Sequence, residues 1–308
     1  MAEYKTDMLV GFTGFVGSNI DAKHDFTYRI NSKNKEEAFG RCPDLLVYAG
    51  LRAEKFLANK DPEKDMDTII QAFEQIKKIK PGKLVLISTV DVYKKPVDVD
   101  ENTKVDTESL AAYGLNRYRL EQMVREEYED ALIIRLPGLF GKNIKKNFIY
   151  DYINVIPSML KADKFEELAA SSSLLKKNYE LQDNGFYKCM APCRELKEEF
   201  GRLGFSALNF TDSRGVFQFY NLENLWADIN VALDNGIRLL NIATEPVTIA
   251  EVYGALTKGK SFTNEIMQTA PYYDYKSVHA TLFGGERGYF CNKETVLREI
   301  VEFVEKSV

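Results

Sequence analysis

Three glycines near the start of the chain constrain its fold more than any other feature. Residues 8–20 read MLVGFTGFVGSNI, in which a short apolar run precedes Gly11, Gly14 and Gly17 and then residues that can open a helix. Glycines at a strand-to-helix turn let the backbone approach a pyrophosphate, and the start of the next helix offers N–H donors and a positive dipole. The spacing is GxxGxxG and differs from the usual GxGxxG, so a tight turn that binds nothing is the alternative.

Composition narrows the classes of protein to which the chain belongs. Its 308 residues, 45% of them hydrophobic, suffice for a substantial core in one large domain or in two lobes. The net charge of −5 and the lack of a basic patch interleaved with aromatic residues argue against a nucleic-acid partner. The sequence shows neither a secretory signal nor a run approaching the roughly 20 apolar residues of a membrane span. We therefore expect a soluble, cytoplasmic protein without a membrane partner.

The cysteines give little support for a metal site. Only Cys189 and Cys193 are close together, as CMAPC, and the two histidines, His24 and His279, lie far from them in the sequence. A structural zinc site normally needs four such ligands at characteristic spacings. We expect ordinary reduced thiols and no metal.

Apolar strands that alternate with amphipathic helices predict a Rossmann-like α/β fold with a doubly wound parallel sheet. Runs such as DLLVYA and KLVLIS are typical of strands buried on both faces. Beyond the glycine loop, the expected strands are residues 25–30, 44–49, 83–88 and 131–136, and the expected helices are residues 15–22, 36–40, 63–79 and 110–128. Ligands bind beyond the carboxyl ends of such strands, so Ala49-Gly50, Thr89 and Pro137-Gly138 are expected to share one edge with the glycine loop.

The character of the sequence changes after Gly141. Residues 142–210 are helix-prone, rich in lysine and glutamate, and interrupted at residues 171–173 and 183–185. Short strands are expected at residues 217–220 and 239–243, and helices at residues 224–234, 248–256 and 292–304. We predict a dinucleotide-binding domain at residues 1–142, with later contributions from about 211–243, and a smaller, mostly helical substrate-binding lobe at residues 143–308.

The residues after the second strand bear on the choice between NAD and NADP. A dinucleotide fold usually places an acidic residue about 20 residues beyond the glycine loop, where it accepts hydrogen bonds from the adenosine ribose. This chain has Asn31, Ser32 and Lys33 there. Without the acid nothing repels a 2′-phosphate, and Ser32 and Lys33 are placed to contact one. This favours NADP slightly over NAD, while solvated turn residues are the alternative.

Tyr113 and Arg117 form a candidate acid/base pair. They lie four residues apart in AAYGLNRYRLE, on one face of an expected helix. An unperturbed tyrosine has a pKa of about 10, and a fixed positive charge beside it favours the phenolate. Thr89, at the end of the preceding strand, is placed to hold a substrate oxygen. A surface helix with a tyrosine–arginine pair is the alternative for these two residues alone.

The order of several short motifs resembles the extended short-chain dehydrogenase/reductase family, which contains nucleotide-sugar epimerases, dehydratases and 4-keto-sugar reductases. From residue 8 to about 255, the matching pieces are GFTGFVG, VYAG, LISTVDVY, YGLNRYRLE, RLPGLFG, FQFYNLENLWADI and LNIATEPVTIAEV. In that family the hydroxyl residue at the position of Thr89 and the tyrosine of YxxxK, here Tyr113, act with the lysine four residues on. The resemblance therefore implies roles for Thr89 and Tyr113 in transfer of hydride and a proton at a sugar carbon.

Three departures bear on this resemblance. The family lysine, which contacts the nicotinamide ribose and lowers the tyrosine pKa, is Arg117 here, and an arginine fork is bulkier and differently directed. The interval from Gly17 to Asp44 is short for two strands and their helix, so the adenosine side is expected to be abbreviated. Val90-Asp91 stands where dehydratases carry two adjacent acids, which leaves Asp91 alone to assist.

The resemblance, together with the glycine loop and the acid/base pair, implies an NAD(P)-dependent epimerase or 4-keto reductase acting on a nucleotide-linked sugar. Tyr113 would exchange a proton with the sugar oxygen, Thr89 would orient that oxygen, and Arg117 would anchor the ribose. The sequence leaves open epimerisation or reduction, and a non-sugar carbonyl as substrate. A catalytically silent NAD(P)-binding scaffold is the second hypothesis, because the family lysine is missing.

The predicted site residues follow from these arguments. The catalytic set is Thr89, Tyr113, Arg117 and Asp91. The cofactor-binding set is Gly11, Thr13, Gly14, Phe15, Val16, Gly17, Asn31, Ser32, Lys33, Ala49, Gly50, Ser88, Tyr113, Arg117 and Pro137. The substrate candidates are Lys146, Asn147, Arg214 and Arg287, the two arginines because they can grip a pyrophosphate with paired hydrogen bonds. The resemblance also implies a homodimer formed through the helices at residues 63–79 and 110–128.

Overall fold

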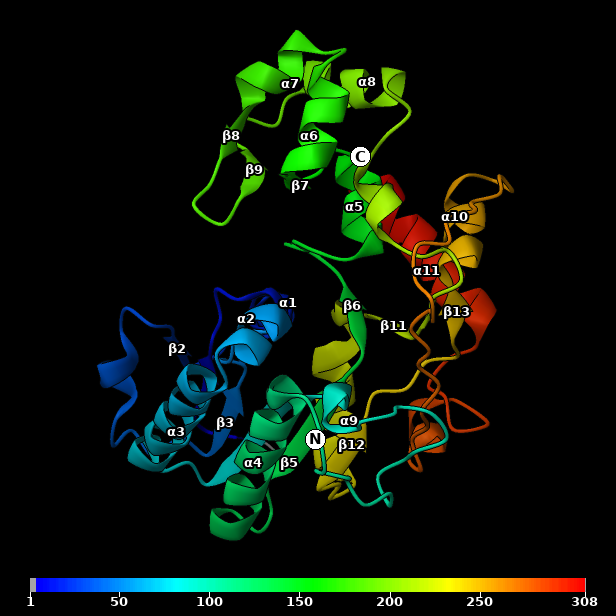
Figure 1. Ribbon diagram of the computed structural model, residues 1–308. Coiled ribbons are helices and arrows are strands. Elements are labelled where there is room, and N and C mark those ends of the chain that lie inside the picture. The colour runs from blue at the N-terminus through cyan, green and yellow to red at the C-terminus, as the bar shows by residue number, and fades with distance from the viewer. Residues whose placement is uncertain (1–3, 308) are drawn as a thin grey trace. The chain divides into compact units, whose positions relative to one another are not determined.

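The computed structural model describes residues 4–307, which divide into two compact units (Figure 1). The first unit comprises the described part of Met1–Asn143 together with Val216–Val247 and Tyr272–Glu299. The second comprises Ile144–Gly215, Thr248–Pro271 and the described part of Ile300–Val308. Residues 272–299 belong to the first unit, whereas the sequence predicted that they lie in the substrate-binding lobe.

A six-stranded parallel sheet forms the centre of the first unit and confirms the predicted Rossmann-like α/β class. Its strand order is β12-β5-β4-β3-β1-β2. The strands are β1 (Asp7–Val10), β2 (Tyr28–Ile30), β3 (Leu45–Tyr48), β4 (Lys83–Thr89), β5 (Leu132–Leu136) and β12 (Leu239–Asn241). Alternate side chains of these strands point to opposite faces, and both sets are apolar, so each face has its own core.

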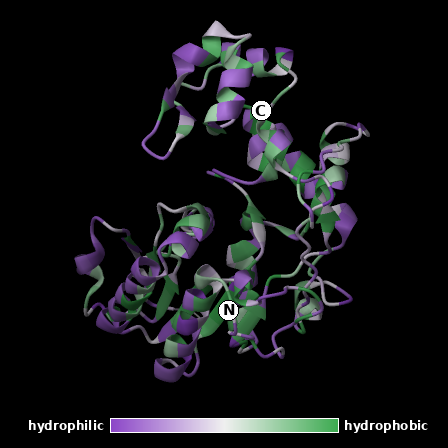
Figure 2. Cartoon of the chain, in the orientation of Figure 1, coloured by the Kyte–Doolittle hydropathy of each residue, from purple (hydrophilic) through white to green (hydrophobic). Residues whose placement is uncertain are grey.

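Helices cover both faces of this sheet. One core includes Ile20 of α1 and Ile229 of α9, while the other includes Ile69 and Ile76 of α3 and Leu120 of α4. The strands appear green and α3 and α4 largely purple with green patches in Figure 2, as expected for buried strands and amphipathic helices. The helices of this unit are α1 (Phe15–Asp21), α2 (Lys55–Lys60), α3 (Pro62–Ile79), α4 (Ala112–Glu127) and α9 (Leu225–Asp234).

The strand order fixes where a ligand can bind. β1 lies between β2 and β3, so the chain reverses its direction of winding between β1 and β3. Such a switch point opens a crevice beyond the carboxyl ends of the strands. Only β2 lies beyond β1 on the outer side, which confirms the abbreviated adenosine side.

The remaining elements connect the sheet to the second unit. The three-residue strands β6 (Gly138–Phe140) and β11 (Phe219–Asn221) pair in parallel. The two-residue strands β10 (Val216–Phe217) and β13 (Val247–Thr248) form a second small pair. Helix α11 (Lys293–Ser307) has residues in both units. Helix α2 has no counterpart among the expected elements, because six residues are too few to display apolar periodicity. No helix in the described part of the chain combines the length and apolar character needed to cross a bilayer.

The second unit contains a three-stranded antiparallel sheet that the helix-prone composition concealed. Its order is β7-β9-β8, and a small core including Leu160, Phe165 and Phe200 packs against it. The elements are α5 (Phe148–Asn154), β7 (Met159–Lys161), α6 (Ala162–Ala169), α7 (Ser173–Asn178), β8 (Tyr179–Leu181), β9 (Phe186–Cys189), α8 (Arg194–Arg202) and α10 (Ile249–Leu256). The Asp-Asn-Gly turn at residues 183–185, interpreted from sequence as a break between helices, joins β8 to β9, and Gly185 has a φ of +78°.

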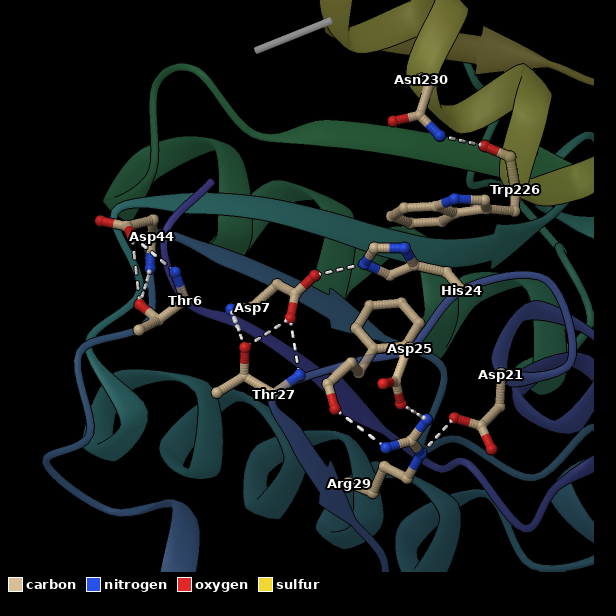
Figure 3. A network of polar contacts seen from close by, with 11 residues as sticks. Thr6, Asp7, Asp21, His24, Asp25, Thr27, Arg29, Asp44, Trp226 and Asn230 are labelled. Atoms are coloured by element: carbon tan, nitrogen blue, oxygen red, sulfur yellow. Dashed lines mark hydrogen bonds and ion pairs between the residues drawn. The ribbon is translucent and has the colours of Figure 1, made fainter. Parts of the chain in front are cut away.

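A polar network secures the edge of the large sheet opposite the glycine loop (Figure 3). Asp7, the first residue of β1, accepts hydrogen bonds at Oδ1 from the Thr27 N–H and hydroxyl at 2.7 and 2.9 Å. Its Oδ2 lies 2.5 Å from His24 Nε2, and the His24 ring stacks on Trp226 with centroids 4.3 Å apart. Burial raises the pKa of Asp7, but the contacts with Thr27 and His24 outweigh burial, so the pKa lies below its ordinary value.

This network makes stability depend on pH. Since the Asp7 pKa is lower in the folded than in the unfolded chain, its contribution is complete above the unfolded value of about 3.9 and is lost as pH falls through the folded value. Asp7→Asn is expected to lower the free energy of unfolding at pH 7 by about 1.5–3 kcal/mol. The difference from wild type should narrow between about pH 5 and pH 2. Urea unfolding followed by the fluorescence of Trp226 measures it, and a pH-independent difference would contradict the assignment.

Candidate active site

The glycine loop is built from backbone contacts that exclude larger residues. Gly11 has a φ of +92°, and a Cβ placed there would lie 2.4 Å from the Ala49 carbonyl oxygen. A Cβ on Gly17 would lie 2.1 Å from the Gly11 carbonyl oxygen. Gly14 is the N-cap of α1 and offers no side-chain acceptor, so the first turn of α1 is not capped by its own N-cap side chain. The loop therefore presents backbone N–H groups at the switch point between β1 and β3.

The other predicted loop residues divide into exposed and packed positions. Thr13 is exposed, whereas Phe15 and Val16 are partly buried against the core. Ala49 donates its N–H to the Val10 carbonyl oxygen at 2.9 Å, which places Ala49-Gly50 beside the glycine loop. These contacts bring the ends of β1 and β3 together as the sequence predicted for one edge of the sheet.

A cavity of about 330 Å³ lies at the end of β2. It is open to solvent, and its lining is Ser32, Lys33, Asn34, Lys35, Glu36 and Glu37, so two carboxylates lie beside the two lysines. Asn31 does not line this cavity: its Oδ1 accepts the Lys33 N–H at 2.8 Å and stabilises the turn. Ser32 and Lys33 thus remain the candidates for a 2′-phosphate contact.

Tyr113 and Thr89 lie together where β4 ends and α4 begins. The Tyr113 side chain is buried and lies near enough to the Thr89 hydroxyl for that group to lower its pKa. Gly114 permits this approach, because a Cβ there would lie 2.0 Å from the Asp91 carbonyl oxygen. The Tyr113 N–H donates to Asn59 Oδ1 at 2.9 Å, which fixes α2 against the start of α4.

Burial determines the protonation of Tyr113. Loss of solvation raises its pKa, Arg117 and the Thr89 hydrogen bond lower it, and Asp91 raises it. The net pKa is higher than the ordinary value of about 10. Arg117 thus lowers the Tyr113 pKa, as expected of a neighbouring cation, but burial outweighs it and the side chain is a neutral phenol near pH 7.

Arg117 packs against the ring of Tyr113 but directs its donors elsewhere. Its guanidinium carbon lies 4.7 Å from the Tyr113 ring centroid. NH1 donates to both carboxylate oxygens of Asp65 at 3.1 and 3.0 Å, and NH2 donates to the Arg52 carbonyl oxygen at 3.0 Å. The side chain is only 6% exposed. Arg117 thus joins α4 to α3, and its predicted contact with a ribose remains untested.

Asp91 belongs to a charged cluster that the sequence did not reveal. Its Oδ1 accepts a hydrogen bond from Lys55 Nζ at 2.8 Å and another from the Tyr273 hydroxyl at 3.1 Å. The Tyr273 ring in turn stacks on Phe217 with centroids 5.6 Å apart. Lys55 and Tyr273 are far from Asp91 in sequence, and Lys55 lies on the unpredicted helix α2, so no local motif pointed to them.

Two further predicted cofactor residues have different surroundings. The Ser88 hydroxyl donates to Glu121 Oε1 at 2.5 Å and so joins a buried polar network beneath the edge of the sheet. Pro137 follows β5 directly and is partly buried. Of these two residues, Pro137 lies at the carboxyl end of its strand without a side-chain hydrogen bond that would compete with a cofactor contact.

The predicted substrate residues do not form one group within either unit. Asn147 Oδ1 caps α5 by accepting the N–H groups of Ile149 and Tyr150, and Lys146 is exposed beside it in the second unit. Also in the second unit, Arg214 is paired with Asp212 at 2.8 Å and Glu265 at 3.1 Å.

Arg287 lies in the first unit, is exposed, and contacts Glu286 at 3.4 Å. Among the described residues, no cluster of three or more His, Cys, Asp or Glu side chains is arranged to hold a metal.

Comparison with known proteins supports the fold. No protein-family model matches the sequence, and no curated protein matches it significantly. Among solved structures, the dTDP-4-dehydrorhamnose reductase of Yersinia enterocolitica is similar at 13% identity with a TM-score of 0.65, over 97% of this chain and 100% of that one.

Two further solved structures cover nearly the whole chain. The Bacillus anthracis dTDP-4-dehydrorhamnose reductase in complex with NADP is 14% identical, with a TM-score of 0.64 and complete coverage of both chains. The UDP-glucose 4-epimerase of Thermotoga maritima with UDP-glucose is 12% identical, with a TM-score of 0.61, and covers 98% of this chain and 99% of that one. The chain shares the fold of these proteins.

Proposed function

We propose that the first unit binds NADP or NAD at the edge between β1 and β3 and reduces or epimerises a nucleotide-linked sugar. The observation that carries this proposal is the juxtaposition of Thr89 and Tyr113 on the same sheet edge as the glycine loop. A backbone cradle for a pyrophosphate and a neutral phenol beside a hydroxyl are the two parts that nicotinamide-dependent carbonyl chemistry requires.

The residues present fit a dinucleotide. Gly11 and Gly17 let the loop pack tightly on itself and on Ala49, because a Cβ on either would collide with backbone. Thr13 and Gly14 at the start of α1 remain exposed, and that exposed backbone is where a pyrophosphate would approach. Ser32 and Lys33 line a cavity where a 2′-phosphate would contact them. Similar folds bind NADP in one reductase and UDP-glucose in one epimerase, which supports this pairing of cofactor and substrate.

Protonation of Tyr113 favours reduction over epimerisation. When bound, the nicotinamide supplies the hydride. Tyr113, whose pKa is raised, is poised to donate its phenolic proton to a carbonyl oxygen, and Thr89 is placed to hold that oxygen. Asp91 accepts hydrogen bonds from Lys55 and Tyr273, so it serves as a fixed acceptor rather than as the acid of a dehydration.

The silent scaffold is the second candidate, and the surroundings of Arg117 favour it. Two of its nitrogens donate to Asp65 and the Arg52 carbonyl, so the cation at the position of the family lysine is engaged in holding α3 and α4. If no other cation takes the role of the family lysine, the site binds a dinucleotide without catalysing hydride transfer.

One pair of measurements tests the proposal. The purified chain is titrated with NADPH and NADH, and NADPH oxidation is then followed with a panel of 4-keto nucleotide sugars. We expect binding and turnover. Dinucleotide binding without turnover of any keto sugar, and without exchange between sugar epimers, would support the silent scaffold. Failure to bind either dinucleotide would contradict both candidate functions.

Lys33 is expected to set the preference for NADP. Lys33→Glu replaces a cation in the cavity by an anion, which repels a 2′-phosphate and can accept hydrogen bonds from a 2′-hydroxyl. The ratio of NADPH to NADH affinity should fall by about 10- to 100-fold. Lys23→Glu, at an exposed position outside the cavity, is the control. Equal ratios in the two variants would place the 2′-phosphate elsewhere.

The homodimer and the cytoplasmic location remain predictions. In the first unit α3 and α4 contact each other through Asp65, Asn116 and Arg117, and Ile70 of α3 is 46% exposed. An apolar side chain on that surface is compatible with pairing of two copies through these helices.

A further inference from the structure

Arg117 stands where the family that the sequence resembles has a lysine, and its hydrogen bonds go to other parts of the protein. Its NH1 donates to the Asp65 carboxylate, its NH2 donates to the Arg52 carbonyl oxygen, and its side chain is buried. A second cation near Tyr113 is therefore the better candidate to contact a ligand oxygen.

Helix α2 brings such a cation to the site. Asn59 accepts the Tyr113 N–H, which fixes α2 at the start of α4. Lys55 lies four residues before Asn59 and hence on the same face of the helix. Its Nζ donates to Asp91 Oδ1 at 2.8 Å, and the Tyr273 hydroxyl donates to the same oxygen at 3.1 Å. Asp91 in turn donates its N–H to Thr89 Oγ1 at 3.1 Å, so Lys55 belongs to the surroundings of Thr89 and Tyr113.

The Lys55 ammonium has capacity for one more acceptor. An ammonium carries three N–H donors, and the Asp91 carboxylate accepts from one of them at 2.8 Å. The side chain is 49% exposed, so the remaining direction is accessible from solvent. Burial lowers the pKa of Lys55, but Asp91 and Tyr273 outweigh burial and raise it, which keeps the group charged at neutral pH.

We propose that Lys55 is a ligand-binding residue whose ammonium donates a hydrogen bond to an oxygen on a sugar ring in the Tyr113 site. The inference rests on the proposed function. Two sugars offer that oxygen: the ribose of the dinucleotide, through a hydroxyl, and the hexose of the substrate, through its keto or hydroxyl groups. In this arrangement Arg117 holds the helices, and Lys55 makes the ligand contact.

Lys55→Met and Lys55→Arg test this role, with Lys94→Met as the matched control. Lys94 also pairs with an aspartate, Asp106, but on the surface at 3.5 Å. The dissociation constant for NADPH and the KM for a reducible 4-keto nucleotide sugar are measured for each variant. Lys55→Met should raise one of these constants by about tenfold or more, and Lys55→Arg, which keeps the charge, should recover part of the loss.

Each outcome decides a point. An increase in the dissociation constant for NADPH assigns the contact to the ribose, and an increase in KM alone assigns it to the substrate sugar. The inference would be overturned if Lys55→Met behaved like Lys94→Met, or if Lys55→Arg lost as much affinity as Lys55→Met. In either case, dinucleotide binding by the wild type would leave the proposed function standing. A wild-type chain that binds no dinucleotide would instead remove the proposed function and this inference together.

Discussion

Replacing Tyr113 by phenylalanine is expected to lower kcat for reduction of a 4-keto nucleotide sugar by about 10²- to 10⁴-fold, with a much smaller effect on the dissociation constant for NADPH. The buried ring and its contact with the Arg117 guanidinium persist in phenylalanine, so the site keeps its shape. What is lost is the hydroxyl that lies near Thr89 and would carry the proton.

The pH dependence of the wild-type rate sharpens this prediction. Because the Tyr113 pKa is raised above about 10, the phenol remains protonated and the reduction rate should show no loss from Tyr113 ionisation up to about pH 9. Tyr118→Phe, a partly buried tyrosine on the same helix, is the control and should change kcat less than twofold. Comparable rates for Tyr113→Phe and Tyr118→Phe would show that another group supplies the proton.

The sheet was predictable because its signal is local. Runs such as LLVY in β3 and LVLI in β4 are apolar on both alternating sets, which only a strand covered on both faces tolerates. The short interval between Gly17 and Asp44 likewise left room for only one strand beyond β1, as the structure shows. Local pattern and chain length were sufficient for these features.

The candidate site depends on contacts between distant residues, and these were not predictable. Nothing in YGLNRYRLE indicates that Arg117 pairs with Asp65 on another helix. Lys55 contacts Asp91 only because the segment after β3 forms the six-residue helix α2. Tyr273 belongs to residues 272–299, a later segment of the chain that is part of the first unit. The antiparallel strands of the second unit were hidden because each spans only three or four residues.

A buried ion pair beneath the site explains one residue that sequence reasoning assigned to the cofactor. Arg135 of β5 donates from Nε and NH2 to the Glu121 carboxylate of α4 at 3.0 and 2.5 Å, and from NH1 to the Tyr93 hydroxyl at 2.7 Å. Ser88 donates to the same carboxylate. The side chains of Arg135 and Glu121 are 2% and 0% exposed. Ser88 therefore belongs to the hydrogen-bonded surroundings of Glu121, and its contact with a cofactor stays a prediction.

Removal of one partner of this pair is expected to destabilise the first unit by about 3–5 kcal/mol, because Glu121→Gln leaves the Arg135 charge buried without a counter-ion. Urea unfolding followed by Trp226, the sole tryptophan and a residue of the first unit, measures this loss. The double variant Glu121→Leu with Arg135→Met removes both charges and should be less destabilised than the sum of the single variants. Arg238→Met, which breaks an exposed pair with Asp130 at 2.9 Å, is the control and should cost less than about 1 kcal/mol. If Glu121→Gln unfolds at the same urea concentration as Arg238→Met, the Arg135–Glu121 pair does not contribute to stability as predicted.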